Sequence, residues 1–296
     1  MRKFIFIMVC FFMMGSKGDG VDVVIISGDV LGLHTKHGPA KEYVIWNECG
    51  KRLGKKKAEK RAGEYADMIS GSIVDVYRKT GEFVNPDYVV AILYRESSND
   101  ECIVGRKEMS HVLGKEMKRS WSKADYVKQL REWSAIFSRA NKFCKKGGRS
   151  VGLDCLDGQM AKTNSHFMGV YSWDLGAAQF RWPGAQTRKR SVTLPGGRSI
   201  ERVSVTDLLD AEVSIHMLVE DLALYRKGCK RHRHRVRTKK FKKWRELTSE
   251  EAYFVHHHTG MNAWSDDYWK RVNKHLIDIR NNRDSLLLAN LFTVKF

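Results

Sequence analysis

The sequence predicts a mainly α-helical protein, and three observations lead to this prediction. Apolar residues recur at intervals of three and four over several long stretches, which is the spacing of amphipathic helices. Runs that alternate between apolar and polar residues are few, and helix start signals such as Asn85-Pro86 precede apolar stretches. With 296 residues and 42% hydrophobic composition, the chain can form a sizeable core in one large domain or two small ones.

Residues 1–16 have the pattern of a secretory signal peptide. Arg2 and Lys3 precede an apolar run, Phe4–Met14, and small residues follow it. The run is too short to span a bilayer comfortably. Cys10 lies inside this run, which leaves lipidation as a minor alternative. We therefore expect an exported protein that acts in the periplasm or outside the cell.

Export permits disulfide bonds. Without Cys10, five cysteines remain, an odd number that leaves at least one unpaired within the chain: Cys49, Cys102, Cys144, Cys155 and Cys229. Cys144 and Cys155 flank a glycine-rich loop, so we expect them to pair. No spacing of cysteines and histidines suggests structural zinc, and we expect neither a metal nor another cofactor.

The first expected helix follows a mixed N-terminal segment, residues 17–56, to which the sequence assigns no function. Apolar residues then recur at helical spacing, and Gly81 is a plausible end signal. These positions are Ala58, Ala62, Tyr65, Ile69, Ile73 and Val76.

A second, shorter helix begins at Asn85, whose side chain can accept a hydrogen bond from a free backbone N–H. Pro86 fits the first helical position, and Asp87 places a negative charge near the positive end of the helix dipole. One face of this helix carries Val89, Ile92, Leu93 and Glu96.

Glu96 is the only acid on that apolar face. Burial of a carboxylate is costly, so its pKa should rise, which suits a general acid that works near neutral pH. The alternative is that Glu96 pairs with one of the many basic neighbours, since ion pairs also perturb carboxylates.

Residues 105–170 have the character of an insertion. Within them, Ser122 precedes another amphipathic helix with an apolar stripe formed by Tyr126, Leu130, Trp133, Phe137 and Ala140. An aromatic and glycine-rich segment follows at 171–184, and Leu194–Gly197 predicts a turn. A helix is expected over residues 207–226.

Later signals predict two more helices. Thr248–Glu251 matches a capping box before a helix that reaches His256-His257-His258, with Gly260 as its end. A last helix carries Tyr268, Val272, Leu276 and Ile279, and residues 285–296 form an apolar C-terminal segment.

The formal net charge of +19 favours an anionic partner, such as nucleic acid, anionic lipid or an acidic wall polymer. The basic segment 226–245 holds twelve lysines and arginines and no acid. It is either a solvated loop or an anion-binding edge on which Phe241 and Trp244 offer stacking surfaces. Composition alone does not separate these two interpretations.

Several motifs, taken in order, resemble those of the soluble lytic transglycosylase family, which cleaves peptidoglycan. Tyr94–Ser98 resembles the family's Glu-Ser motif, and Asp174–Phe180 resembles its glycine-rich turn that ends in Gln. The stretch 207–215 is similar to the start of the helix that follows this turn, and Tyr268–Val272 resembles a Tyr/Val pair. His257–Gly260 lies where the family has an aromatic-Asn-Ala-Gly motif, so His257 and His258 depart from the pattern.

The resemblance implies a lysozyme-like helical domain of the goose-lysozyme type over residues 57–284, with the insertion 105–170 and the basic segment. It implies that Glu96 is the single catalytic acid and then base. Ser97, Gly176 and Gln179 would bind substrate, with Tyr171, Trp173 or Trp182 stacking on sugars; for Trp182, core packing is slightly favoured. His257 or Tyr253 would replace the family's acid-orienting Tyr, with His258 beside them.

A second carboxylate is not evident: Asp174 is the best candidate, but an Asp before a tight turn more often caps backbone. The expected partners are peptidoglycan glycan strands and an anionic polymer surface, without specific nucleic acid, and the protein is expected to be a monomer. Three alternatives remain: a water-using muramidase, a secreted nucleic-acid-binding protein, and an inactive wall-binding relative.

Overall fold

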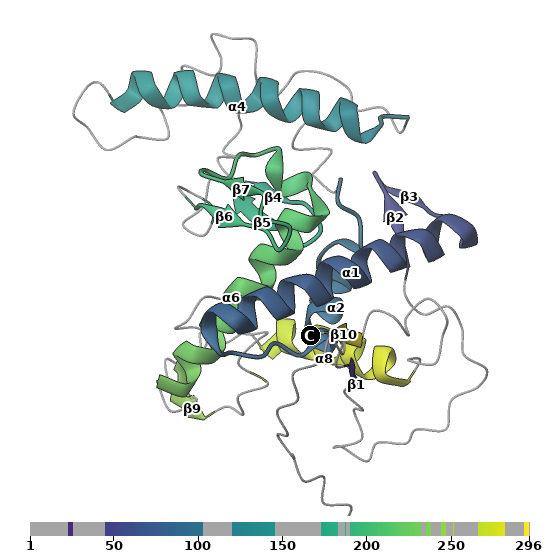
Figure 1. Ribbon diagram of the computed structural model, residues 1–296. Coiled ribbons are helices and arrows are strands. Elements are labelled where there is room, and N and C mark those ends of the chain that lie inside the picture. The colour runs from purple at the N-terminus through teal and green to yellow at the C-terminus, as the bar shows by residue number, and fades with distance from the viewer. Residues whose placement is uncertain are drawn as a thin grey trace, which may run out of the picture.

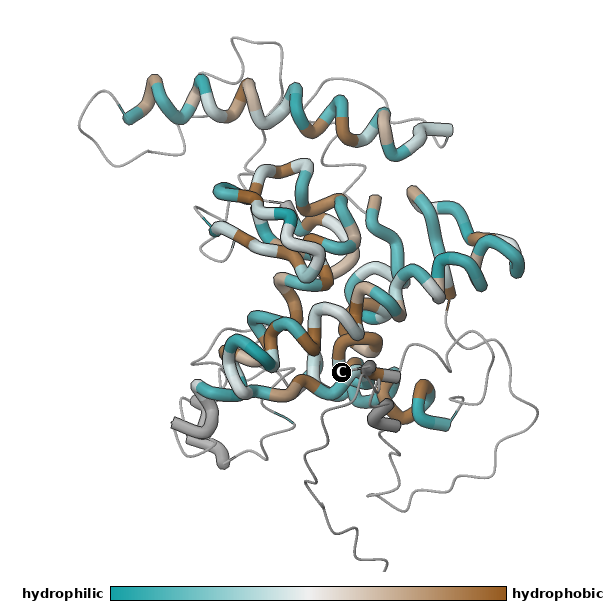
Figure 2. Tube along the Cα trace, in the orientation of Figure 1, coloured by the Kyte–Doolittle hydropathy of each residue, from teal (hydrophilic) through white to brown (hydrophobic). Residues whose placement is uncertain are grey.

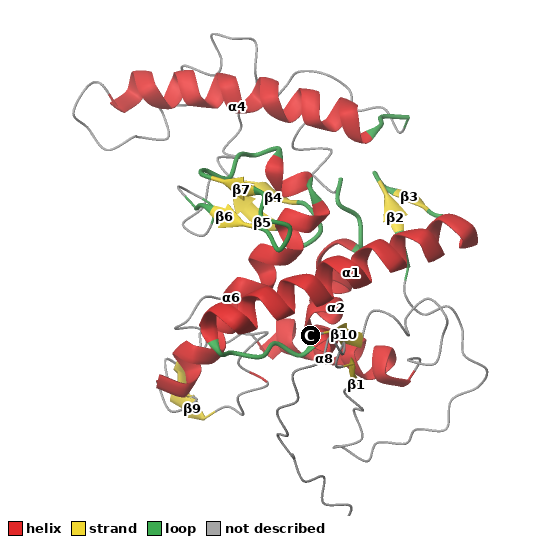
Figure 3. Cartoon of the chain, in the orientation of Figure 1, coloured by secondary structure: helices red, strands yellow, loops and turns green. Residues whose placement is uncertain are grey.

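The computed structural model describes residues 23–25, 45–102, 120–145, 173–182, 187, 190–231, 235–237, 244–246, 251, 266–281 and 293–295. Within these residues the protein is mainly helical, with five α-helices and small two-stranded hairpins, which confirms the predicted class (Figures 1 and 3). The helices, labelled as in Figure 1, are α1 (Lys55–Thr80), α2 (Pro86–Ser97), α4 (Lys123–Lys145), α6 (Ala211–Arg231) and α8 (Asp266–Asn281), with a short 3₁₀ helix at Asp207–Leu209.

The strands pair antiparallel, mostly with their neighbours in sequence. The hairpins are β2 (Asn47–Glu48) with β3 (Lys51–Arg52), β4 (Trp173–Leu175) with β5 (Phe180–Trp182), β6 (Val192–Thr193) with β7 (Ser199–Ile200), and β8 (Arg235–Arg237) with β9 (Trp244–Glu246). β1 (Val23–Ile25) pairs with β10 (Thr293–Lys295), so segments near the two ends of the chain lie side by side.

Helices α1 and α2 follow their sequence signals closely. Gly81 ends α1 in the left-handed conformation, and its N–H donates to the carbonyl of Tyr77. The Asn85 side chain accepts the N–H of Asp87 at 2.9 Å, as a helix cap does, with Pro86 at the first helical position.

The core lies where four helices meet. α1 packs against α6 and α2 packs against α8, and hydrophobic residues concentrate around these junctions in Figure 2. The expected apolar stripe of α2 is fully buried at Val89, Ile92 and Leu93. α2 is therefore the central helix, and its position is fixed by its neighbours on several sides.

Asp87 does more than complement the dipole of α2. Its side chain is only 1% exposed, and its carboxylate accepts a hydrogen bond from Arg280 of α8 at 3.0 Å. The two helices are thus joined at one end of their contact by a partly buried ion pair, whose Asp87 side is fully enclosed.

The helix expected over 207–226 is divided. A 3₁₀ turn covers Asp207–Leu209, and α6 then runs from Ala211 to Arg231. The division falls at Asp210, which is extended (ψ 118°) and whose side chain accepts the N–H of Glu212 at 3.0 Å. An unrecognised cap, Asp210, therefore restarts the helix.

Helix α4, inside the expected insertion, lies apart from the other helices and above the β4–β5 and β6–β7 hairpins in Figure 1. Its predicted cap is confirmed, since Ser122 and Asp125 exchange hydrogen bonds at the helix start. Trp182 of β5 packs edge-on against Trp133 and near Phe137, so Trp182 serves packing, as favoured above.

A disulfide joins Cys49 to Cys102, a pairing that the sequence did not predict. It is consistent with an oxidising, extracytoplasmic location. Cys144 is also disulfide-bonded, but Cys155, its expected partner, lies outside the described residues. In the described part of the chain, none of the helices has the length and apolar character needed to cross a bilayer.

Candidate active site

Glu96 lies in the last turn of α2 and is half-buried. Its carboxylate Oε1 accepts a hydrogen bond of 2.6 Å from the hydroxyl of Tyr268 on α8. Burial raises the pKa of Glu96 above its ordinary value, although the hydrogen bond from Tyr268 and the charge of Arg95 lower it in part. The carboxyl group therefore holds its proton to higher pH than an exposed glutamate does, as expected for an acid on an apolar helix face.

Tyr268 is the acid's direct partner, and the sequence did not place it in the site. Only 4% of its surface is exposed, and burial followed by the nearby Glu96 charge raises its pKa well above that of a free tyrosine. The hydroxyl thus stays protonated and acts as a donor. Two signals were available. One was its place in the Tyr268–Val272 stretch noted above, and the other was its position on the apolar stripe of α8, because a buried tyrosine hydroxyl needs a polar partner.

A glycine-containing turn between β4 and β5 lies against the end of α2. The buried Ser97 hydroxyl donates to the carbonyl of Leu93 at 3.0 Å and to that of Ala177, in the turn, at 2.7 Å. The N–H of Ala178 donates to Ser214 of α6 at 3.1 Å. The residue after the acid thus joins α2 to the turn, and α6 holds the turn from the other side.

The turn itself depends on Gly176. Its φ is +75°, and a Cβ at this position would lie 1.8 Å from the carbonyl oxygen of Leu208. Gln179, with φ of 52°, donates both its backbone N–H and its side-chain amide to the carbonyl of Gly176, the latter at 2.8 Å. Glycine is therefore required for close packing of this turn against the 3₁₀ helix.

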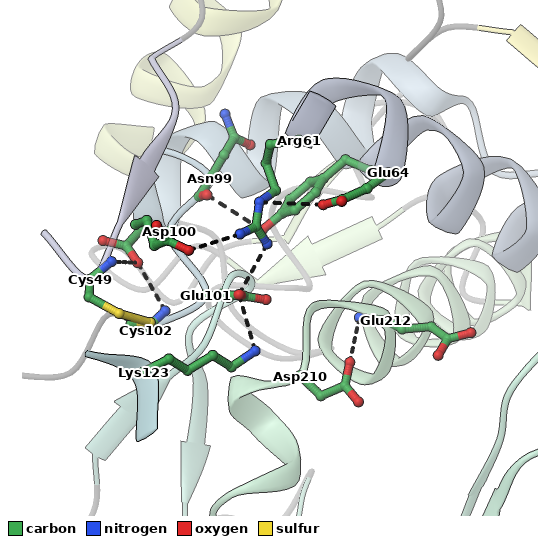
Figure 4. A network of polar contacts seen from close by, with 12 residues as sticks. Cys49, Arg61, Glu64, Asn99, Asp100, Glu101, Cys102, Lys123, Asp210 and Glu212 are labelled. Carbon is green, nitrogen blue, oxygen red and sulfur yellow. Dashed lines mark hydrogen bonds and ion pairs between the residues drawn. A yellow bond between two sulfur atoms is a disulfide. The ribbon is translucent and has the colours of Figure 1, made fainter. Parts of the chain in front are cut away.

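The segment that follows the acid is fixed by several contacts (Figure 4). Asn99 donates to the carbonyl of Ile45 and accepts a bond from Tyr65 on its own carbonyl. The carboxylate of Asp100 accepts the N–H groups of Cys49 at 2.9 Å, Gly50 at 2.6 Å and Cys102 at 2.9 Å. Together with the Cys49–Cys102 disulfide, Asp100 attaches the β2–β3 hairpin to the end of α2.

Glu101 extends this attachment to two further helices. The carboxylate, almost fully buried, is bound by Arg61 of α1 at 3.0 Å and by Lys123 of α4 at 3.1 Å. Arg61 in turn contacts Glu48 of β2 and Glu64 of α1. The six residues after Glu96 are thus connected to α1, α4 and the β2–β3 hairpin, which restrains the acid's helix end (Figure 4).

The structure brings four of the expected site residues together: Glu96, Ser97, Gly176 and Gln179. The expected residues Tyr171, Tyr253, His257 and His258 lie outside the described residues, and so does the side chain of Trp173.

Asp174 forms an exposed ion pair with Arg181 across the β4–β5 hairpin, at 3.1 Å. Its negative charge also contributes to the raised pKa of Glu96. In the part of the chain that the structure covers, no group of three or more His, Cys, Asp or Glu side chains is arranged to hold a metal ion.

Comparisons with known proteins identify no relative. No protein-family model matches the chain, and neither a characterised protein nor a solved structure matches it significantly.

Proposed function

We propose that this protein is an exported lytic transglycosylase that cleaves the β-1,4 bond between N-acetylmuramic acid and N-acetylglucosamine in peptidoglycan, on a lysozyme-like domain. The observation that carries the proposal is the single half-buried acid, Glu96, whose pKa is raised and whose carboxylate is held by the Tyr268 hydroxyl. The order of motifs along the sequence, which resembles that of the lytic transglycosylase family, supports a catalytic role for this acid. The Cys49–Cys102 disulfide supports the expected export.

One carboxyl group is sufficient if the substrate supplies its own nucleophile. Protonated Glu96 donates its proton to the glycosidic oxygen as the bond from that oxygen to C1 of the muramic acid breaks. The resulting carboxylate then takes the proton of the sugar's own 6-hydroxyl, whose oxygen bonds to C1 and closes a 1,6-anhydro ring. No water is consumed, and Glu96 ends protonated, ready for another cycle.

The environment of Glu96 is suited to both halves of this cycle. Burial favours the protonated form that donates first, while the Tyr268 hydrogen bond stabilises the carboxylate that forms afterwards. The contacts after Glu96 keep the helix end in place, and the Gly176–Gln179 turn beside it is the proposed holder of sugar N-acetyl groups. Tyr268, not His257 or Tyr253, is our proposed acid-orienting tyrosine.

The test is wall cleavage by matched variants. Glu96→Gln keeps the shape of the side chain but cannot exchange a proton, so we expect release of soluble muropeptides from purified walls to be abolished. Glu59→Gln, the same change at an exposed position of α1, is the control and should retain activity. Circular dichroism and melting confirm that both variants fold. Full activity of Glu96→Gln would refute the proposal.

A further inference from the structure

A compact cationic surface lies at the start of α1 and on the adjoining β3 strand. Within residues 51–57 the sequence contains no acid, and the exposed cations are Lys51, Arg52, Lys55, Lys56 and Lys57. None of them forms an ion pair with another described side chain. Figure 2 shows this end of α1 and the β2–β3 hairpin as predominantly hydrophilic. We call these five residues the cationic surface.

The placement of these charges disfavours the helix that carries them. Lys55, Lys56 and Lys57 occupy the first turn of α1, where the helix dipole is positive and negative side chains are preferred. The first turn contains no acid, and the capping residue, Gly54, supplies no side-chain hydrogen bond. Stability of α1 therefore does not account for three lysines here, whereas a negatively charged partner does.

The cationic surface has a fixed position relative to Glu96. The β2–β3 hairpin, which carries Lys51 and Arg52, is attached to the chain just after α2 by the Cys49–Cys102 disulfide and by Asp100 (Figure 4). Arg52 is also close enough to act electrostatically on Tyr94, which precedes Glu96 by two residues on α2. Burial and Asp278 raise the pKa of Tyr94, and the charge of Arg52 offsets part of that rise. An anion held at this surface is thus held near the catalytic helix.

We propose that the cationic surface is a docking site for the carboxylates of peptidoglycan stem peptides, and that it presents the wall strand to Glu96. This inference rests on the proposed function for its substrate, but its docking step does not depend on catalysis. Several exposed lysines that can adjust their positions suit a flexible polymer of spaced carboxylates better than a single small anion, because ammonium groups act as mobile point charges. Such contacts are screened within about 10 Å at 0.1 M salt, so docking should be salt-sensitive.

The first experiment measures sedimentation of the protein with insoluble purified walls, in a Glu96→Gln background so that cleavage plays no part. The triple variant Lys55→Glu/Lys56→Glu/Lys57→Glu should bind walls about tenfold more weakly, or weaker still, at low salt. Each lysine would form one exposed ion pair with a wall carboxylate, worth roughly a factor of two in affinity, and the new glutamates repel those carboxylates. The same variant should melt at a higher temperature than its parent, since the new acids match the helix dipole. Weaker binding by a more stable protein excludes unfolding as the cause.

The matched control makes the same charge change on another helix. Lys128→Glu/Arg131→Glu/Arg139→Glu alters three exposed cations of α4 and should leave wall binding within about twofold of the parent, if binding depends on place and not on net charge alone. An equal loss in both triple variants would overturn the proposal, as would unchanged binding by the α1 variant.

Two treatments of the walls identify the anion. Chemical amidation of the stem-peptide carboxylates should reduce binding by the Glu96→Gln protein to the level of the α1 triple variant, whereas extraction of phosphate-bearing polymers should not. The reverse result would overturn the assignment to carboxylates. If the α1 triple variant lost affinity for DNA but kept its affinity for walls, that result would likewise overturn the assignment to carboxylates and would assign the cationic surface to nucleic acid. If docking behaves as described while wild-type protein leaves walls uncut, the proposed function fails and the docking site stands.

Discussion

Gly176→Ala tests whether the turn beside Glu96 is built as described. The native φ of +75° is unfavourable for an L-residue by about 1–2 kcal/mol. The new Cβ would also lie 1.8 Å from the carbonyl oxygen of Leu208, so the backbone must shift, at a further cost of about 1–3 kcal/mol by analogy with overpacked cores. The free energy of unfolding should therefore fall by about 2–5 kcal/mol in all.

Two other glycines separate these contributions, and all three variants are compared by urea unfolding. Gly197 has φ of +82° and nothing within 4 Å of its would-be Cβ, so Gly197→Ala should show only the conformational cost. Gly196 lacks both features, so Gly196→Ala should change stability least. If Gly176→Ala costs no more than Gly197→Ala, the close approach of the turn to Leu208 is wrong.

Three further predictions concern the acid and its supports. The pKa of Glu96 in the folded protein is raised above 4.5, so as pH rises from that value the folded protein keeps protons that the unfolded chain loses, and wild-type stability should fall. Glu96→Gln should reduce this fall, measured by urea unfolding across about pH 4–8. Burial also raises the pKa of Asp221, to about 6, so this carboxyl accounts for the part of the fall that remains. Tyr268→Phe removes a hydrogen bond that favours the Glu96 carboxylate, so the pKa of Glu96 should rise and the alkaline limb of the pH profile of wall cleavage should move to higher pH. The control, Tyr77→Phe at an exposed position, should leave that limb in place. An unmoved limb in Tyr268→Phe would contradict the pairing of Tyr268 with Glu96. Replacing both Cys49 and Cys102 with Ser should lower the free energy of unfolding by about 4 kcal/mol, because the disulfide closes a loop of 53 residues in the unfolded chain. Chemical denaturation measures the change, and a value near zero would show that the disulfide adds little stability.

Local chemistry made much of the helical structure predictable. The Asn85 cap, the Ser122 cap and the Gly81 end each depend on neighbours within a few residues, and all three are present. The buried stripes of α2 and α8 follow from spacing alone, because a helix places residues three and four apart on one face. The central feature of the candidate site, an acid with a raised pKa on an apolar face, could be predicted from the sequence for the same reason.

Contacts between distant segments were not predictable in this way. Tyr268 is 172 residues from Glu96, and no local pattern links the two side chains. The Cys49–Cys102 disulfide and the hydrogen bonds that Asp100 accepts join a hairpin to the end of α2 across about fifty residues. An odd set of cysteines allows many pairings, so the sequence did not single out this disulfide. Asp87 was expected only to complement a dipole, yet this buried carboxylate forms an ion pair with Arg280.

Mass spectrometry of the muropeptides released from purified walls tests the central claim most directly. If Glu96 passes a proton between the glycosidic oxygen and the sugar's own 6-hydroxyl, wild-type protein should release products with 1,6-anhydromuramic acid ends, and Glu96→Gln should release none. Products with reducing ends would show that water is the nucleophile, and release of anhydro products by Glu96→Gln would contradict the role of this acid.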